Sequence, residues 1–309
     1  MNKPRITVLL TTYNRCTLLA RAVESVVAGS YQDFELIILD DASTDGTQAY
    51  AEQIKDPRVQ YVRMRENGGV LRARNRGFDM ARGEIVTILD DDDELEPDAL
   101  ETIVGEFQRP DRQDVDILWF HCLDAEAGQI SGSLPISEGE LPFELYLCGR
   151  ISGDFWMAFR ASTIAKYRFD ERLKAHESLL WLRMHREHKA WFSPKVVCRK
   201  YREHGGPRLC DVDVRMGQLE HTTLAMAQYI KEFGKDLARI SPRLLGAKLA
   251  YLGLHQMAIS DFAAGRRSVL QSLRYRFSFK YLLLFPASFV ISADFVKSAI
   301  RRIEAAAIS

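Results

Sequence analysis

The 309-residue sequence lacks the cysteine and charge patterns that mark several classes of protein. Its five cysteines are scattered and form no C-x-x-C pair, which argues against a disulfide framework or a zinc site and favours reduced thiols in a cytosolic compartment. Lysine plus arginine and aspartate plus glutamate number 42 each, so the bulk charge gives no reason to expect nucleic-acid binding.

Long apolar runs and two nucleotide-binding motifs are missing as well. The nearest approach to a membrane span, residues 281–300, is interrupted by a proline and two charged residues. The N-terminal stretch MNKPRITVLLTTYNR has no long apolar core, so we expect no signal peptide. There is no G-x-x-x-x-G-K-S/T loop, and neither the Gly68-Gly69 pair nor the Gly205-Gly206 pair makes a G-x-G-x-x-G turn after the first strand. These absences exclude P-loop enzymes and dinucleotide dehydrogenases.

Strand-like and helix-like runs alternate along the first 120 residues. Apolar, β-branched runs predict strands at residues 5–12, 34–41, 59–64 and 84–93. Helical spacing and capping residues predict helices at residues 16–29, 43–54 and 70–83 and another from Pro97. Because the strands are apolar throughout, they fit a sheet covered on both faces. We therefore expect an α/β fold with a Rossmann-like, mostly parallel central sheet flanked by helices.

The pattern loosens beyond Asp116. Strands are predicted at 115–121 and 153–160 and from Ala190, and a helix at 177–188. His185 and His188 lie one turn apart on that helix, where a solvated face is a simpler explanation than a metal site. From Val214 onward the chain has helical patterns only.

Polar residues follow three of the predicted strands at the point where each strand ends. They are Thr11 to Asn14, then Asp40 and Asp41, then Asp90 to Asp93. Since ligands of parallel sheets bind at the carboxyl ends of the strands, these clusters should meet. Two carboxylates about 6 Å apart repel by roughly 3 kcal/mol at an effective dielectric near 20, so the acidic run needs a cation. A divalent cation carrying a diphosphate fits, and a solvated acidic loop before the next helix is the alternative.

Four ordered segments resemble the family 2 glycosyltransferases of the GT-A fold: VLLTTYNR, LIILDDASTDGT, ENGGVLRARNRGFDMARGEIVTILDDDDELEPDAL and YREH. The resemblance is strong over residues 5–110, moderate to about residue 205 and negligible beyond. It implies an inverting, metal-dependent transferase that uses Mn²⁺ or Mg²⁺. The donor would be a nucleotide-diphosphate sugar, most simply a UDP-sugar. The acceptor would be a glycan or lipid-linked saccharide in surface polysaccharide synthesis.

The resemblance also assigns donor-binding roles. Thr11 and Tyr13 match positions that contact the base and ribose, and Asp41 matches the carboxylate that accepts a hydrogen bond from uracil N3–H. Arg74 matches a basic residue at the base and phosphate end.

The run of four aspartates matches the D-x-D motif of the family. Asp90 and Asp92 take its outer places, so Asp92 is expected to contact the metal directly and Asp90 to lie nearer the ribose and the metal's waters. The extra Asp91 leaves this assignment ambiguous by one residue, and Asp91 is grouped with the nucleotide. Asp93 is grouped with the donor sugar or acceptor.

The general base of the family corresponds here to the stretch KAHESLLWLRM. Counting back from Trp181 and Arg183 places Glu177 at the base and His176 beside it, although the family has Asp where this chain has Glu. A first-turn helix charge is the alternative explanation for Glu177.

Three further residues are candidates by the same resemblance. His204 could join the metal or diphosphate, and as a loop histidine it could equally be a surface residue. Asp154 and Trp156 match the region that shapes the sugar and acceptor pocket, while core packing explains Trp156 equally well.

The chain is therefore predicted to have a catalytic domain at 1–210, with a nucleotide-sugar half at 1–110 and an acceptor half at 111–210, and a helical appendage at 211–309. Between Gly265 and Arg302 basic clusters flank an apolar, aromatic stretch, which suggests peripheral binding to an anionic membrane surface, on the cytoplasmic face of the inner membrane. A packing or dimer role is the alternative. The oligomeric state, the donor sugar and the linkage stay open.

Two other functions compete with transfer. Sugar nucleotidyltransferases share the sheet and the metal, but they carry a Gly-rich basic loop after the first strand, and TTYNRCTLL has none. A non-catalytic relative that only binds nucleotide sugars or glycans is the other alternative, motivated by the altered HES stretch at the predicted base.

Overall fold

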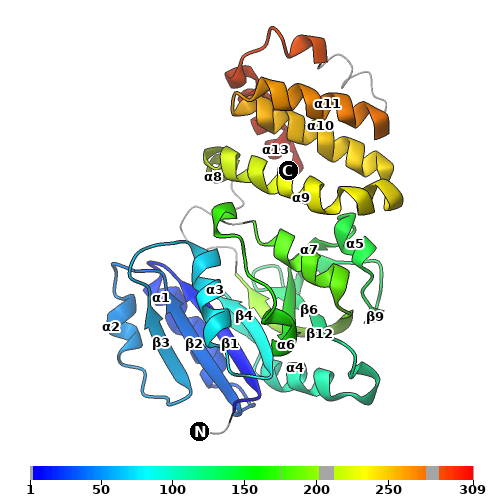
Figure 1. Ribbon diagram of the computed structural model, residues 1–309. Coiled ribbons are helices and arrows are strands. Elements are labelled where there is room, and N and C mark those ends of the chain that lie inside the picture. The colour runs from blue at the N-terminus through cyan, green and yellow to red at the C-terminus, as the bar shows by residue number, and fades with distance from the viewer. Residues whose placement is uncertain (1–2, 175, 202–211, 276–284, 309) are drawn as a thin grey trace. The chain divides into compact units, whose positions relative to one another are not determined.

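The computed structural model describes residues 3–174, 176–201, 212–275 and 285–308 (Figure 1). It divides into two compact units, residues 1–204 and 205–309, which are described separately below. The first unit has α/β architecture and the second contains only helices among its described residues.

A mostly parallel sheet forms the centre of the first unit. Its strand order is β3-β2-β1-β4-β11-β6-β12-β5 within the described residues. The parallel half consists of β1 (Ile6–Thr12), β2 (Phe34–Asp40), β3 (Val59–Arg63) and β4 (Ile85–Asp90). Every residue of β1 and β2 is buried, as expected for strands covered on both faces.

The other half of the sheet mixes directions. It contains β5 (Glu94–Leu95), β6 (Ile117–Asp124), β11 (Phe155–Arg160) and β12 (Ala190–Lys200). β11 runs antiparallel to both β4 and β6, and β12 runs parallel to β6. Short strands extend the edges: β7 (Gln129–Ile130) and β9 (Gly139–Glu140) join this sheet, while β8 (Gly132–Ser133) and β10 (Ser152–Gly153) pair with each other.

The helices of the first unit follow the predicted alternation with the strands. They are α1 (Cys16–Val27), α2 (Thr47–Ala51), α3 (Val70–Met80), α4 (Ala99–Gln108), α5 (Phe143–Leu147), α6 (Ala161–Ile164) and α7 (Ser178–Glu187). Single 3₁₀ turns lie at Pro110–Arg112 and Glu171–Leu173.

Helix α2 is shorter than the predicted span of 43–54. The Asp45 carboxylate accepts the backbone N–H groups of Cys16 (3.1 Å) and Thr47 (3.0 Å), which holds the preceding residues in a turn rather than a helix. Because of these competing side-chain hydrogen bonds, α2 begins at Thr47 rather than at residue 43.

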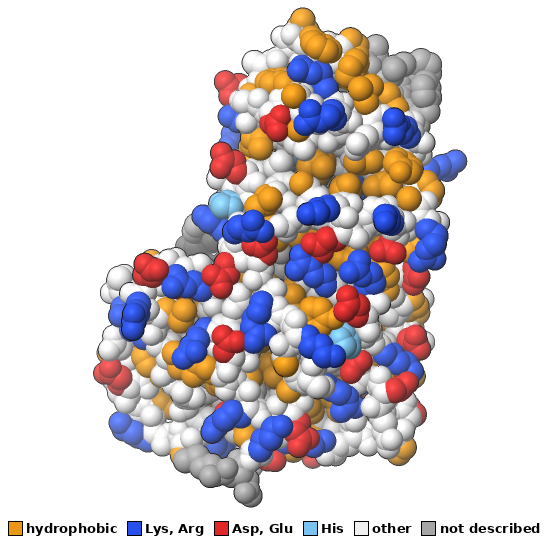
Figure 2. All heavy atoms as spheres, viewed as in Figure 1, with side chains coloured by type: hydrophobic (Ala, Val, Ile, Leu, Met, Phe, Trp, Pro, Cys, Tyr) orange, Lys and Arg blue, Asp and Glu red, His pale blue; other side chains and the backbone are white. Residues whose placement is uncertain are grey.

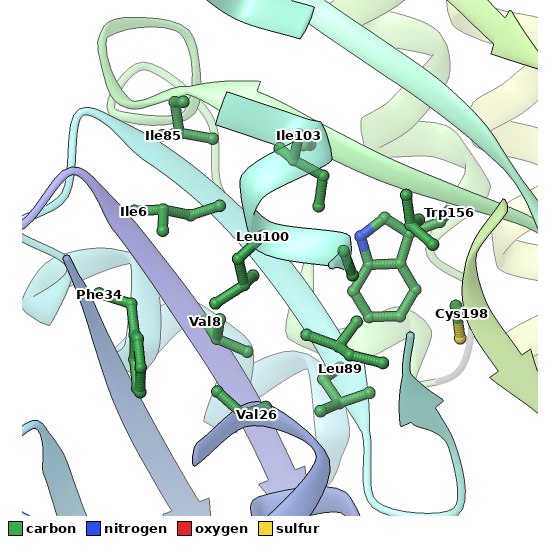
Figure 3. Close-up of a cluster of buried hydrophobic side chains, with 14 of the residues drawn as sticks. Ile6, Val8, Val26, Phe34, Ile85, Leu89, Leu100, Ile103, Trp156 and Cys198 are labelled. Atoms are coloured by element: carbon green, nitrogen blue, oxygen red, sulfur yellow. The ribbon is translucent and has the colours of Figure 1, made fainter. Parts of the chain in front are cut away.

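Alternation along β1 sends side chains to both faces of the sheet. Ile6 and Val8 join the large apolar cluster that includes residues of α1 and α4 (Figure 3). Leu9 faces the other way and meets α3 at Gly77, where an added Cβ would lie 2.6 Å from Leu39 and 3.0 Å from Leu9. The helix can approach the sheet this closely because position 77 has no side chain.

The register of the parallel strands brings the predicted polar clusters to one edge. Thr12 pairs with Asp40 across β1 and β2, and Thr11 pairs with Asp90 across β1 and β4. The predicted meeting of the three strand ends is therefore confirmed.

The second unit is built around α10. Its helices are α8 (Val212–Gly217), α9 (Leu219–Ile240), α10 (Pro242–Ala258), α11 (Phe262–Tyr275) and α13 (Ala293–Ile308). Pro242 begins α10 at a first-turn position and separates it from α9. Helix α10 packs against α9, α11 and α13, and its contact with α11 is close because Gly253 and Gly265 face each other there.

No helix in the described ranges combines the length and the apolar character needed to cross a bilayer. Part of the predicted membrane-facing stretch, residues 276–284, lies outside the described residues.

Candidate functional site

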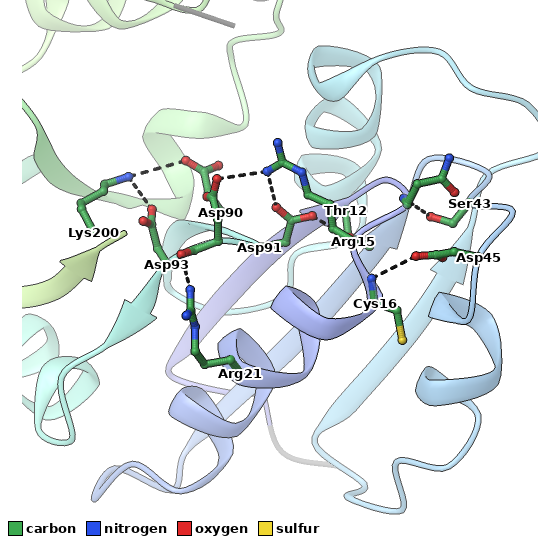
Figure 4. A network of polar contacts seen from close by, with 12 residues as sticks. Thr12, Arg15, Cys16, Arg21, Ser43, Asp45, Asp90, Asp91, Asp93 and Lys200 are labelled. Carbon is green, nitrogen blue, oxygen red and sulfur yellow. Dashed lines mark hydrogen bonds and ion pairs between the residues drawn. The ribbon is translucent and has the colours of Figure 1, made fainter. Parts of the chain in front are cut away.

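The acidic run begins at the end of β4 and connects it to β5, which pairs with β12 in the same sheet (Figure 4). The Asp90 carboxylate pairs with Arg74 (2.6 Å) and with Lys200 (3.6 Å), and Lys200 also binds Asp93. Lys200 is the last residue of β12, so the far half of the sheet supplies a cation to the near half. The sequence motifs gave Lys200 no role, although it directly precedes YREH.

Asp91 and Asp92 are held from the other side by Arg15, immediately before α1. The guanidinium Nη1 lies 3.1 Å from Asp91 and 3.0 Å from Asp92. Thr12 also donates its hydroxyl hydrogen bond to Asp91 (2.7 Å). Arg15 directly follows the polar end of β1, and its charge was the only sequence signal for this contact.

Burial and ion pairing shift the pKa values of three aspartates of this run in different directions. Burial alone would raise the pKa of Asp90, but Arg74 and Lys200 together lower it. Burial raises the pKa of Asp91 to about 6 despite Thr12 and Arg15. Burial, opposed by Lys200 and reinforced by Asp90, raises the pKa of Asp93 to about 7.

Among the ion pairs between described residues of this site, five carboxylates contact three cations. The carboxylates are Asp90, Asp91, Asp92, Asp93 and Glu177, and the cations are Arg15, Arg74 and Lys200. Carboxylate oxygens are the ligands that divalent cations such as Mg²⁺ and Mn²⁺ prefer.

The positions of three carboxylates fit a divalent cation. Ligand oxygens of Asp90, Asp92 and Asp93 all lie within 4.8 Å of one another. Opposite ligands of Mg²⁺ are about 4.2 Å apart, so modest side-chain rotations would suffice. The structure places Asp93, predicted beside the sugar, in this cluster, whereas Asp91 is engaged by Thr12 and Arg15.

Arg74 links the acidic run to the candidate base. It lies on α3 and is 4% exposed, and its guanidinium pairs with Asp90 and with Glu177. Burial opposes the charge of Arg74, but Glu177 and Asp90 outweigh it and raise the pKa of Arg74. Arg74 thus lies at the predicted phosphate end, and its contact with the nucleotide stays a prediction.

Glu177 occupies the position immediately before α7. Its side chain makes no capping hydrogen bond and pairs with Arg74, while its position at the N-terminus of α7 also fits the alternative of a first-turn helix charge. His176 precedes it and donates its backbone N–H to the Leu173 carbonyl (3.2 Å). The catalytic role of Glu177 and the sugar contact of His176 stay predictions.

Asp41 organises the loop before α3. Its two carboxylate oxygens accept the backbone N–H groups of Gly68 (2.8 Å) and Gly69 (2.7 Å), and Gly69 has a positive φ of 87°. The glycine pair served in the sequence only to exclude a dinucleotide motif, so this contact was missed. Of the other predicted base and ribose contacts, Thr11 is buried and Tyr13 is exposed.

The residues predicted to contact the sugar or acceptor differ in their exposure to solvent. Trp156 is 3% exposed and lies in the apolar core (Figure 3), which supports the packing alternative, and its contact with the acceptor stays a prediction. Asp154 is exposed, beside Gly153 with its positive φ of 80°. His204 lies outside the described residues.

The predicted solvated histidine face is wrong for His185. Its ring is buried, with Nε2 accepting a hydrogen bond from the Trp119 indole (2.7 Å) and Nδ1 bonded to the Trp181 carbonyl (2.7 Å). His188 contacts Asp116 at 3.1 Å.

Carboxylates, cations and a glycine loop thus gather at the carboxyl-end edge of the parallel strands, the edge where α/β proteins bind their ligands. The chain belongs to glycosyl transferase family 2: the model "Glycosyl transferase family 2" matches residues 7–165.

Two curated relatives are similar over part of the chain. The GalNAc(5)-diNAcBac-PP-undecaprenol beta-1,3-glucosyltransferase of Campylobacter jejuni is 30% identical over 200 residues, covering 61% of this chain and 63% of the relative. The putative colanic acid biosynthesis glycosyl transferase WcaA of Escherichia coli is 37% identical over 110 residues, covering 35% and 39%. Both matches span less than two thirds of the relative.

Solved structures share the fold. TarS residues 1–349 of S. aureus in complex with UDP-GlcNAc gives a TM-score of 0.64 at 15% identity, covering 96% of this chain and 92% of that one. The mannosyltransferase PcManGT of Pyrobaculum calidifontis, in complex with GDP-Man and Mn²⁺, gives 0.56 at 20% identity, covering 98% and 85%. The expected α/β, GT-A fold with a helical C-terminal region is confirmed.

Proposed function

We propose that this protein is an inverting glycosyltransferase that moves a sugar from a UDP-sugar to a glycan or lipid-linked saccharide in surface polysaccharide synthesis. The observation that carries the proposal is the acidic turn, where three strand ends converge and the carboxylates of Asp90, Asp92 and Asp93 lie close together. The names of the relatives, one acting on an undecaprenol-linked saccharide and one in colanic acid synthesis, support the class of acceptor.

Asp90, Asp92 and Asp93 would hold Mn²⁺ or Mg²⁺, which when bound supplies positive charge against the diphosphate leaving group. Asp41 would accept the uracil N3–H in addition to its two backbone donors, because each carboxylate oxygen can accept more than one hydrogen bond. Thr11, Tyr13 and Asp91 would line the nucleotide side.

Glu177 would take the proton of the acceptor hydroxyl. Arg74 contacts Oε1 of this carboxylate, so Oε2 is the oxygen assigned to the proton. The acceptor oxygen bonds to the anomeric carbon as the bond from that carbon to the phosphate oxygen breaks, and UDP leaves with the electron pair. A single displacement on the face opposite the leaving group inverts the anomeric centre. Arg74 positions the base by holding it next to Asp90.

The helical unit would place the enzyme peripherally on an anionic membrane, on the cytoplasmic face. Phe289, Val290 and Phe295 are 64%, 86% and 64% exposed, and Arg266 lies over the Phe289 ring at 4.4 Å. Exposed apolar side chains beside basic ones are typical of segments that lie in a membrane interface. A lipid-linked acceptor would be reached from that surface.

Metal-dependent donor binding and transfer test the proposal together. UDP should raise the thermal stability of the protein in the presence of Mn²⁺ and lose this effect in EDTA, since a ligand at 100 times its Kd adds roughly 2.7 kcal/mol. Asp92→Ala should abolish the metal-linked stabilisation, whereas Asp98→Ala, a change of an exposed aspartate before α4, should retain it. Radiolabelled donors then distinguish transfer from binding alone.

Metal-linked UDP binding without transfer or hydrolysis of any donor would identify a non-catalytic relative. Transfer that survives EDTA unchanged would refute the metal assignment. The same screen of nucleotide sugars identifies the donor.

A further inference from the structure

A groove of about 320 Å³ lies among α9, α10 and α11 of the helical unit. Its apolar lining includes Leu245 and Leu249 of α10, which are 3% and 4% exposed, and Ile230 of α9. A groove of this size is at the lower end of the range of small-molecule sites. It lies outside residues 7–165, the part of the chain that the family model matches.

Three cations surround this groove. Lys231 and Lys235 lie one turn apart on α9, and Arg274 lies near the end of α11. No residue that lines the groove is acidic, and the three cations have no ion pair among the described residues. Figure 2 shows basic and hydrophobic side chains interspersed over one face of this unit.

An arrangement of cations over an apolar floor selects an amphiphilic anion. Three cations placed together without an anion do not stabilise the protein, because each would be solvated equally well if they were apart. Like charges one helical turn apart also repel. A phosphate satisfies several such donors at once, and an apolar chain beside it gains from leaving water.

We infer that the α9–α11 groove binds a single membrane lipid with a phosphate or diphosphate headgroup. Lys231, Lys235 and Arg274 bind the phosphate oxygens, and Leu245 and Leu249 contact the first segment of the apolar chain. This site is separate in sequence from the donor-binding residues, and its occupation requires no sugar transfer. The inference therefore goes beyond the proposed reaction.

Gly234 provides a way to fill the groove without disturbing the helix. It lines the groove in the middle of α9, and an added Cβ would meet only Ile230, at 3.8 Å. Leucine is also a better helix former than glycine. Gly234→Leu should therefore fold normally and occupy the space of the lipid chain.

Gly105 offers a matched control for that substitution. It lies within α4 of the first unit, and an added Cβ there would meet nothing within 4 Å. Arg243→Glu, a change of an exposed cation on α10 outside the groove lining, is the corresponding control for Lys235→Glu.

The test uses the full chain in EDTA, with farnesyl diphosphate below its micelle concentration as the probe and calorimetry as the readout. The probe should bind at least about tenfold more tightly than inorganic diphosphate or farnesol alone, because it engages both the cations and the apolar floor. Gly234→Leu and Lys235→Glu should each weaken binding by about tenfold or more, a loss of about 1.4 kcal/mol, while Gly105→Leu and Arg243→Glu should match the wild type.

Equal affinity for inorganic diphosphate and the amphiphile would overturn the lipid assignment. Wild-type affinity of Gly234→Leu would overturn the location of the apolar chain. The same titration on Asp92→Ala separates this site from the donor site. If the variant fails to bind the probe, the probe binds at the acidic turn and the groove assignment is wrong. If only UDP binding fails, the proposed function is wrong and the groove assignment stands.

Discussion

At the scale of single residues, the acidic turn is a set of carboxylates that share a few cations. Arg74 and Lys200 share Asp90, and Arg15 shares Asp91 and Asp92. Sequence motifs identified the aspartates and Arg74, because these residues are close together along the chain. They did not identify Lys200, which is 107 residues from the Asp93 that it binds and reaches it only through sheet pairing.

Glu177→Gln removes the predicted proton acceptor while keeping size and polarity. Transfer should fall by roughly 10²–10⁴-fold, with UDP and metal binding unchanged. Glu187→Gln, at the other end of α7, is the matched control because Glu187 bonds only with Tyr167 and Arg186 among the contacts described for it. A Gln variant that turns over acceptor within a fewfold of the wild type would place the base elsewhere, with Asp154 and His176 next to be tested.

His185 should make the stability of the first unit depend on pH. Burial lowers the pKa of His185 to about 4 in the folded protein, against 6.5 when unfolded, so protons bind the unfolded chain more tightly. The contribution is fully present above pH 6.5 and is lost as the pH falls toward 4. A shift of this size corresponds to about 3 kcal/mol.

Urea unfolding followed by tryptophan fluorescence measures this effect, since all four tryptophans lie in the first unit. Asp91 and Asp93 titrate in wild type and variant alike, so the His185 contribution is the difference between their unfolding free energies. The unfolding free energy of wild type minus that of His185→Gln should fall as the pH drops from 6.5 to 4. The curve of His188→Gln should run parallel to that of the wild type. Parallel curves for wild type and His185→Gln would contradict the assignment.

At the scale of elements, the sequence predicted what depends on local pattern. β1, β2 and β4 appear where apolar runs placed them, and their register follows from the parallel sheet. Helix α2 was overestimated because the hydrogen bonds of Asp45 compete with the helix, a contact whose partner Cys16 lies 29 residues away. Asp41 was identified by motif, yet its hold on the loop at 68–69 depends on the fold.

Asp41→Asn should therefore have two consequences in one element. The two glycine N–H groups bind separate carboxylate oxygens, and in the amide one of these oxygens becomes an NH₂ donor. The amide also offers no charge to uracil, and a charge-assisted hydrogen bond is worth roughly 1.5–3 kcal/mol, so UDP affinity should fall about tenfold or more. Hydrogen exchange at Gly68 and Gly69 should accelerate at the same time.

Asp45→Asn is the comparison, because Asp45 also accepts two backbone N–H groups in a neighbouring loop but has no predicted contact with the donor. Unchanged UDP affinity of Asp41→Asn by calorimetry, together with faster exchange, would restrict Asp41 to a structural role.

At the scale of the whole molecule, the two units differ in how far sequence could describe them. The family model covers residues 7–165, where motifs carry both fold and site. In the helical unit, helices could be predicted from periodicity, but which faces meet could not. The contact of Gly253 with Gly265 and the groove around Gly234 arise from packing between helices, for which a single sequence has no local signal.

The helical unit is predicted to bind anionic membranes through Phe289, Val290 and nearby cations. Each Lys or Arg close to such a surface contributes about 1 kcal/mol, and burying an exposed Phe contributes about 1.5–3 kcal/mol. The protein should therefore sediment with vesicles containing anionic phospholipid at low salt and be released at high salt.

The double change Phe289→Ser and Val290→Ser should weaken sedimentation, because it removes side chains that are 64% and 86% exposed. Ile130→Ser, at an exposed apolar residue of the first unit, should have no effect. Equal sedimentation with neutral and anionic vesicles at low salt would assign this surface to packing or dimerisation instead, and UDP binding by the double variant should stay at the wild-type level in either case.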